Sequence, residues 1–243
     1  MTAKKLFVLD FDGVICDSNL EVYTTSFLAF IDLMQIDIED KSITQEKIFY
    51  NLFLKYRDLG RFPPDFLNLW LTALKEVKED FNQNTDPSEH LKSKYRNLYF
   101  SKRDYLKSEG LKNWLSLHVF YDGMEDFISE LFFNEMLYIA SAKDETSISQ
   151  ILEDKGIDFD EKCILGSENY SDKDEMFIKI KEDKKFYSII FIDDNLVNLK
   201  KALNHGFECY FAKWGYGDRH KINQSNIYQI DLANISQLLP TKL

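Results

Sequence analysis

The fold is decided near the N-terminus by the stretch Leu6-Phe7-Val8-Leu9-Asp10-Phe11-Asp12-Gly13-Val14. A short apolar run that stops at an acid is typical of a strand buried on both faces of a parallel sheet. In such sheets ligands bind beyond the carboxyl ends of the strands, which is where Asp10 and Asp12 stand. The stretch therefore predicts a buried strand and, directly after it, the first part of a functional site.

Comparable apolar runs recur in the C-terminal half of the chain, at 136–140, 163–165, 188–192 and 207–211. Two helical patterns, around 148–152 and 196–203, alternate with them and are each followed by a glycine at a helix-ending position. Alternating strands and helices predict βαβ units. We expect an α/β fold with a Rossmann-like, doubly wound parallel sheet.

The segment between the N-terminal apolar run at 6–9 and the next run at 136–140 has a different pattern. From 17 to 118 apolar residues recur mostly at helical spacing, starting with Ser18-Asn19-Leu20-Glu21, which matches a helix capping box. An excursion of about 100 residues is too long for a loop. We therefore expect an all-helical domain at 17–118, inserted into an α/β core made of 1–16 and 119–243.

Composition excludes several classes of protein. The 243 residues are 44% hydrophobic and carry a net charge of −11, which is typical of a folded chain that does not bind nucleic acid or anionic membranes. Three scattered cysteines give no disulfide framework, and four histidines have no zinc-ligand spacing. No membrane span or signal segment is visible, so we expect a cytoplasmic protein, either a monomer or a homodimer.

Polar residues follow the other apolar runs at the same edge of the expected sheet. Ser141-Ala142-Lys143 comes after the second run and Asp193-Asp194-Asn195 after the fourth, and Lys173 lies near the start of a helical stretch between the third and fourth. Carboxylates, a hydroxyl and an amine together suit phosphoryl transfer. Asp10 would be the nucleophile, and Asp12 would protonate the leaving oxygen and later activate water.

Clustered acids repel a phosphate unless a cation offsets them. Two unit charges about 5 Å apart repel by roughly 3 kcal/mol at an effective dielectric of 20. Asp10, Asp193 and Asp194 therefore predict a Mg²⁺ site, because this ion prefers carboxylate and water ligands. Lys173, the Ser141 hydroxyl and nearby backbone N–H groups such as that of Ala142 would hold the remaining phosphate oxygens.

At these residues the chain resembles the haloacid dehalogenase superfamily of phosphohydrolases. The stretch Asp10-Phe11-Asp12-Gly13-Val14-Ile15-Cys16-Asp17-Ser18 is similar to the first family motif, and Ser141, Lys173 and Asp193-Asp194 stand where the second, third and fourth motifs are expected. The position of the insertion resembles that of the family's helical C1 cap. Trp214-Gly215-Tyr216-Gly217 is similar to a segment of phosphoglycolate-phosphatase-like members.

The resemblance implies a Mg²⁺-dependent phosphatase that hydrolyses a small phosphomonoester through an aspartyl-phosphate on Asp10. It implies metal ligation by Asp10, the Asp12 backbone carbonyl and Asp194, and leaves the role of Asp193 open. Two positions depart from the pattern, since Asp174 follows Lys173 where relatives often have proline and Asn198 replaces a further acid. The adjacent Asp193-Asp194 pair is similar to an accepted variant of the fourth motif in that family.

Alternatives remain at this point. A phosphomutase would share the Asp10 and Asp12 pair, and a non-catalytic phosphate-binding or interaction protein could carry a vestigial site. Serine hydrolase and P-loop signatures are absent from the sequence. The partner is expected to be a small phosphorylated metabolite, with phosphoglycolate-like acids, sugar phosphates and nucleotides all open.

One basic stretch, 92–112, lies in the expected helical domain. A solvated helix face is the simpler interpretation of such a stretch. The sharper hypothesis is that Lys102 or Arg103 binds the anionic tail of the substrate, so that substitution would raise KM for the true substrate but not for a small aryl phosphate.

Overall fold

The computed structural model describes residues 4–36, 46–60, 62–77, 86–184, 187–217 and 225–239. The chain divides into two compact units, one made of 1–17 and 119–243 and the other of 18–118. The first junction therefore lies one residue after the expected boundary at 16/17. No helix among the described residues is both long and apolar enough to cross a membrane.

A six-stranded sheet forms the centre of the first unit, the core unit, with strand order β5-β4-β1-β6-β7-β8. Every neighbouring pair in this sheet is parallel. Its strands are β1 (Lys4–Leu9), β4 (Leu137–Ala140), β5 (Ile164–Leu165), β6 (Tyr187–Asp193), β7 (Glu208–Ala212) and β8 (Ile227–Ile230). The predicted doubly wound parallel sheet is confirmed, and β8 is a strand that the sequence analysis did not identify.

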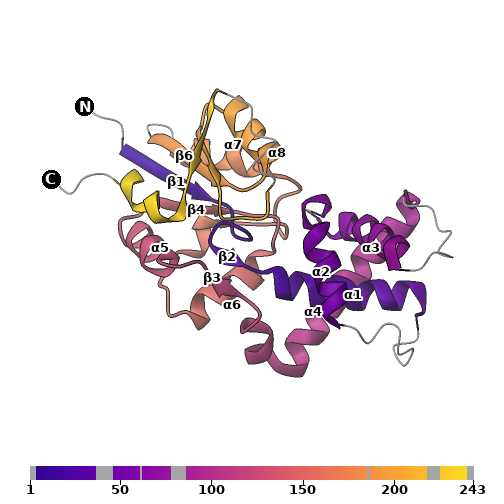
Figure 1. Cartoon of the computed structure of the whole chain (residues 1–243). Helices are drawn as coiled ribbons and strands as arrows, with labels where there is room; N and C mark the ends of the chain where they lie inside the picture. Colours follow the sequence, from indigo (N-terminus) through magenta and orange to yellow (C-terminus); the bar gives the residue numbers. More distant parts are fainter. Residues whose placement is uncertain are drawn as a thin grey trace. The chain divides into compact units, whose positions relative to one another are not determined.

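Helices cover both faces of the sheet (Figure 1). They are α5 (Met124–Phe133), α6 (Glu145–Asp154), α7 (Lys173–Asp183) and α8 (Leu196–Asn204). Phe177 of α7 packs edge-on against Phe191 of β6, whereas Phe127 of α5 packs edge-on against Phe7 of β1 on the opposite face. Burial of apolar residues on both faces explains why the strands read as continuous apolar runs.

A second, two-stranded sheet stands where the core unit connects to the rest of the chain. It pairs β2 (Cys16–Asp17) with β3 (Val119–Phe120) in antiparallel register, with Asp17 opposite Val119. The chain leaves the core unit directly after Asp17 and returns directly before Val119. Both connections are therefore held by one ladder.

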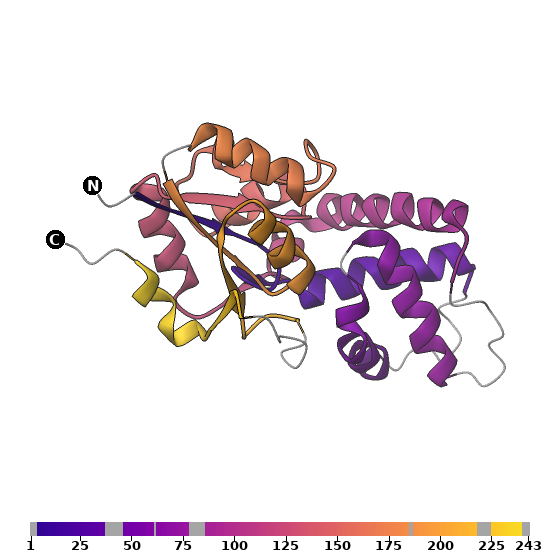
Figure 2. The same cartoon turned by 90° about the horizontal axis from the view of Figure 1, so that it is seen from above.

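The second unit, the helical unit, contains α1 (Asn19–Met34), α2 (Glu46–Lys55), α3 (Pro63–Val77) and α4 (Glu89–Leu115). Helices α1 and α4 lie side by side (Figure 2). An aromatic core joins all four, and Trp70 of α3 donates its indole N–H to the Ser26 hydroxyl of α1 at 3.0 Å. The helical character expected for this segment is present throughout its described residues.

A buried ion pair links the first helix of this unit to the last. Glu21, which is fully buried, accepts hydrogen bonds from Arg103 Nε at 3.0 Å and Nη2 at 3.3 Å. Thr25 donates to the same carboxylate at 2.9 Å, and Arg103 donates to the Tyr99 hydroxyl at 2.8 Å. Ser18 is the N-cap residue of α1 as the sequence predicts, but its side chain makes no cap bond, and Glu21 of the expected capping box binds Arg103.

Arg103→Met should destabilise the protein by about 3–5 kcal/mol, because it leaves the Glu21 carboxylate buried beside no guanidinium. The measurement is urea unfolding followed by circular dichroism. Combining Arg103→Met with Glu21→Leu should recover much of the loss, since no charge then remains buried.

Lys102→Met is the matched control, because Lys102 pairs with the half-exposed Asp32 at 2.7 Å on the surface of the same unit. Its unfolding midpoint should stay near that of the wild type. An Arg103→Met variant as stable as Lys102→Met would contradict the structural role of the buried pair.

Candidate active site

The sheet topology brings three strand ends together. Strand β1 lies between β4 and β6, so Asp10, Ser141 and Asp193 follow or end neighbouring parallel strands. The Asp10 backbone N–H continues the ladder by donating to Ile192 O at 3.0 Å. The sequence separations of these residues are large, yet the parallel register places them along one edge.

Three carboxylates meet at this edge. Asp10, Asp193 and Asp194 are all buried and each offers an oxygen within 4.8 Å of the other two. Lys173, the first residue of α7, places its ammonium 3.0 Å from Asp10 Oδ1 and 2.7 Å from Asp193 Oδ2. Within the described residues, the cluster therefore combines three acids with one directly bound lysine.

Burial and neighbouring charges change the proton affinities in this cluster. Burial raises the pKa of Asp10 to about 6, against the lowering effect of Lys173, and the charge of Asp193 adds to the rise. Burial lowers the pKa of Lys173, but Asp10 and Asp193 raise it by more, so it lies above its ordinary value. The lysine is thus held as an ammonium and offsets part of the negative charge.

The two adjacent aspartates have different partners. Asp193 accepts hydrogen bonds from the Asn195 backbone N–H at 2.6 Å and from Asn198 Nδ2 at 3.0 Å, in addition to its Lys173 contact. Asp194 Oδ2 accepts from the Tyr216 backbone N–H at 2.5 Å. Asn198, which departs from the family pattern, thus helps to orient Asp193.

The loop after β1 turns tightly beneath these carboxylates. Gly13 has a φ of +90°, and its backbone N–H donates to Cys16 O at 2.8 Å. A Cβ at Gly13 would come within 2.9 Å of Asp194 Oδ2, so a side chain there would enter the carboxylate cluster. Glycine at this position is required both by the left-handed backbone and by the available space.

Asp12 lies in the same turn beside an unexpected basic residue. Lys143, whose side chain is fully buried, has its ammonium 3.5 Å from Asp12 Oδ1. Its backbone N–H donates to the Ser141 hydroxyl oxygen at 3.3 Å, and Ala142 lies between them at the end of β4. Sequence reasoning assigned no role to Lys143, and its only signal was its position next to Ser141.

Two aspartates beside Lys173 hold the N-terminus of α7 in place. Asp172 caps the helix by accepting from the Glu175 N–H at 3.1 Å. Asp174 pairs with Lys201 at 2.7 Å and with His205 at 3.0 Å, both from the α8 region. The residue that replaces the common proline therefore ties α7 to α8 immediately beside Lys173.

The donor set fits a hard divalent cation. The potential ligand atoms that converge are carboxylate oxygens, and Asp10 Oδ1 makes no hydrogen bond to a described residue, although its ion-pair partner Lys173 Nζ lies 3.0 Å away. This oxygen therefore retains capacity for a further ligand. Carboxylate-rich sites with few other donors are typical of Mg²⁺.

Lys102 and Arg103 both lie on α4 in the helical unit. Lys102 pairs with Asp32, and Arg103 is buried against Glu21 and Tyr99. These contacts are internal to that unit and account for both charges. Substrate binding by either side chain stays a prediction.

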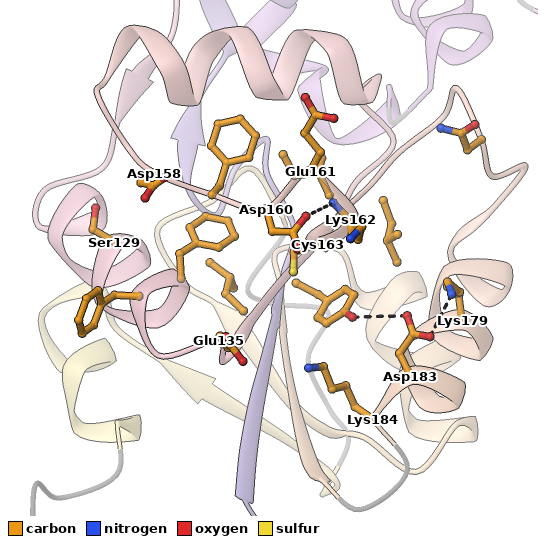
Figure 3. Close-up of a pocket in the computed structure, with 18 of the residues that line it drawn as sticks. Ser129, Glu135, Asp158, Asp160, Glu161, Lys162, Cys163, Lys179, Asp183 and Lys184 are labelled. Carbon is orange, nitrogen blue, oxygen red and sulfur yellow. Dashed lines mark hydrogen bonds and ion pairs between the residues drawn. The ribbon is translucent and has the colours of Figure 1, made fainter.

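A large cavity of about 1230 Å³ lies elsewhere in the core unit, along the edge strand β5 (Figure 3). Its lining mixes acids such as Glu135 and Asp160 with Lys179 and Lys184, around aromatic rings of which Phe133 is exposed. None of the candidate catalytic, phosphate-binding or metal-binding residues lines it. We therefore place the candidate active site at the carboxylate cluster and not in this cavity.

Asp10→Asn should raise the thermal stability of the protein in EDTA at pH 7.5. Because the folded-state pKa of Asp10 is raised from 3.8 to about 6, ionisation costs stability as pH rises through that window. Removing the charge should recover about 1–3 kcal/mol, and the gain should shrink as pH falls towards 4. A stability difference that does not change between pH 4 and pH 7.5 would contradict this origin.

The comparison with solved structures supports the fold, whereas the comparisons by sequence found nothing. No family model and no curated protein matches the chain. Among solved structures, a haloacid dehalogenase-like hydrolase from Streptococcus pneumoniae is similar with a TM-score of 0.64 at 16% identity, covering 94% of this chain and 95% of that one. A predicted phosphoglycolate phosphatase from Haemophilus somnus gives 0.65 at 16% identity, with 98% of both chains covered.

A third similar structure is a CbbY protein from Rhodobacter sphaeroides in complex with xylulose-(1,5)-bisphosphate. It gives a TM-score of 0.58 at 13% identity and covers 96% of this chain and 98% of that one. All three similarities extend over both units of the chain. This chain therefore has the fold of the haloacid dehalogenase-like hydrolases, a parallel α/β core interrupted by a helical unit.

Proposed function

We propose that this protein is a Mg²⁺-dependent phosphatase that hydrolyses a small phosphomonoester through an aspartyl-phosphate on Asp10. The observation that carries the proposal is the meeting of Asp10, Asp193, Asp194 and Lys173 at one edge of the sheet. The fold shared with solved structures that are described as predicted phosphatases supports it.

Asp10 is proposed as the nucleophile. One of its carboxylate oxygens would form a bond to phosphorus while the bond from phosphorus to the leaving oxygen breaks. The Lys173 ammonium, 3.0 Å from Asp10 and buried, would hold an oxygen of the transferred phosphoryl group. Ser141 and the Ala142 backbone N–H would bind the other oxygens from the end of β4.

Asp12 is proposed as the general acid and base. It would give a proton to the departing alcohol oxygen, and then take one from the water that attacks phosphorus and releases inorganic phosphate from Asp10. Lys143, 3.5 Å from the Asp12 carboxylate, would restrict where that carboxylate points between the two steps.

The proposed cation ligands are Asp10, the backbone carbonyl of Asp12 and Asp194, with Asp193 as a supporting residue. When bound, Mg²⁺ would offset the negative charge of the carboxylates and of the phosphate. Because Asp193 already accepts from Lys173, Asn195 and Asn198, we assign it mainly to holding Lys173 and the loop in place.

Asp10→Asn should lower kcat for p-nitrophenyl phosphate by at least about a thousandfold, since the amide is a poor nucleophile. Wild-type turnover should also disappear in EDTA and return with Mg²⁺. Turnover by Asp10→Asn that still depends on Mg²⁺ would overturn the aspartyl-phosphate mechanism.

Asp12→Asn separates the acid role from the metal role. An aryl leaving group departs without a proton more readily than an alkyl one, so this variant should lose more activity on alkyl phosphates than on p-nitrophenyl phosphate. The comparison is a ratio of kcat/KM values for the two substrates. Equal losses on both substrates would argue against proton donation by Asp12.

The helical unit at 18–118 is proposed to act as the cap that selects the substrate. A screen of phosphorylated metabolites would identify that substrate, and sugar bisphosphates belong in it because one structural neighbour binds xylulose-(1,5)-bisphosphate. Product analysis in the same screen separates the alternatives. Phosphate release supports a phosphatase, and transfer to a sugar phosphate supports a phosphomutase.

A further inference from the structure

The segment from Trp214 to Gly217 lies directly against the candidate metal ligand Asp194. A Cβ at Gly215 would overlap Asp194 Cβ and the Gly13 carbonyl, and a Cβ at Gly217 would overlap the Asp194 backbone. Trp214 donates its indole N–H to Val14 O at 3.0 Å. The segment is thus fitted closely against both the first motif and the fourth.

Tyr216 contacts two separate parts of the core unit through two different groups. Its backbone N–H donates to Asp194 Oδ2 at 2.5 Å. Its hydroxyl lies 3.1 Å from Asp17 Oδ1 and 3.3 Å from Cys16 O and shares its one proton between these acceptors, and it is also hydrogen-bonded to the Tyr121 side chain. Asp17 and Cys16 form β2, the strand after which the chain leaves the core unit.

Tyr216 presents its backbone N–H to Asp194 while its side-chain hydroxyl is held at β2, so the hydroxyl contacts help to fix where the N–H lies. Without the hydroxyl contacts, the segment would keep the Trp214 bond to Val14 but lose its attachment to β2. Groups that orient a metal ligand affect metal affinity without touching the metal, because a misplaced carboxylate must be reordered on binding.

We propose that Tyr216 is a positioning residue that sets the Asp194 carboxylate for a divalent cation by anchoring its own segment to Asp17. This inference rests on the metal site of the proposed function. It adds a specific requirement, that the affinity for the cation depends on the phenol hydroxyl that attaches Tyr216 to β2.

The test is a titration of the full chain with Mn²⁺, which serves as a spectroscopic substitute for Mg²⁺, followed by electron paramagnetic resonance without substrate. Tyr216→Phe should weaken binding about fivefold, at the low end of what groups supporting a ligand contribute. Its thermal stability in EDTA should stay near that of the wild type. The Mg²⁺ concentration that gives half-maximal turnover of p-nitrophenyl phosphate should rise by a similar factor.

Tyr210→Phe is the matched control, since Tyr210 donates its hydroxyl to Glu208 on β7 and not to the site. Asp194→Asn provides the reference for loss of the site. If Asp194→Asn binds Mn²⁺ as tightly as the wild type, the proposed metal site and this inference both fail. If Asp194→Asn loses the ion while Tyr216→Phe binds it like Tyr210→Phe, only the inference fails.

A double substitution tests the proposed route. Asp17→Ala should also weaken Mn²⁺ binding, and adding Tyr216→Phe to it should cause less further loss than Tyr216→Phe causes in the wild type, because both changes remove the hydrogen bond between the Tyr216 hydroxyl and Asp17. Independent, multiplying losses would show that the two residues act separately and would overturn the proposed anchoring.

Discussion

The carboxylates of Asp10, Asp193 and Asp194 have oxygens within 4.8 Å of one another at a buried edge of the sheet. Their mutual repulsion is the constraint that the neighbouring residues must offset. At that separation each pair of unit charges repels by roughly 3 kcal/mol at an effective dielectric of 20. One lysine offsets only part of the repulsion. Burial first, and then the charge of Asp193, raise the pKa of Asp10, so that either a proton or a bound cation can relieve the remaining charge.

Several features around the cluster follow from this constraint. Lys173 is the first residue of a helix that is capped by Asp172 and paired to Lys201 through Asp174. These contacts fix the backbone from which the Lys173 ammonium reaches the carboxylates. Neutral donors surround the remaining oxygens, with Asn198 on Asp193 and the Tyr216 N–H on Asp194. Neutral donors stabilise a carboxylate without cancelling the charge that a divalent cation needs.

The fold could be predicted from sequence because its signal is local. Buried parallel strands such as β1 and β6 read as apolar runs, and the order of strands and helices limits the topology. Strand β8 was missed because its four residues are buried only at their two ends, as expected for an edge strand. Strands β2 and β3 have two residues each, too few for any periodic pattern.

The site could be predicted only in part. Asp10, Asp12, Ser141, Lys173 and the Asp193-Asp194 pair follow strands or begin a helix, and the structure brings these elements to one edge. Their chemical roles stay predictions. Lys143 and Tyr216 were not assigned, because their contacts with Asp12 and Asp194 join segments distant in sequence and Tyr216 uses its backbone N–H.

Helix α1 begins after Ser18 as the sequence predicts, but the expected cap bond of the Ser18 side chain is missing for the same reason. Ser18 and Glu21 have the right types and spacing for a capping box, but Glu21 binds Arg103, 82 residues later. Local pattern reasoning has no access to such a partner, and a buried guanidinium is a stronger partner for a carboxylate than one backbone N–H.

The ladder between β2 and β3 has a consequence for how the protein can be divided. Asp17 and Val119 are opposite each other in that ladder, so the two ends of the 18–118 segment leave from neighbouring points. A tight hairpin turn could join them without moving either strand. The chain is thus built so that its helical unit can be exchanged for another of different size, with the edge that carries the carboxylates unchanged.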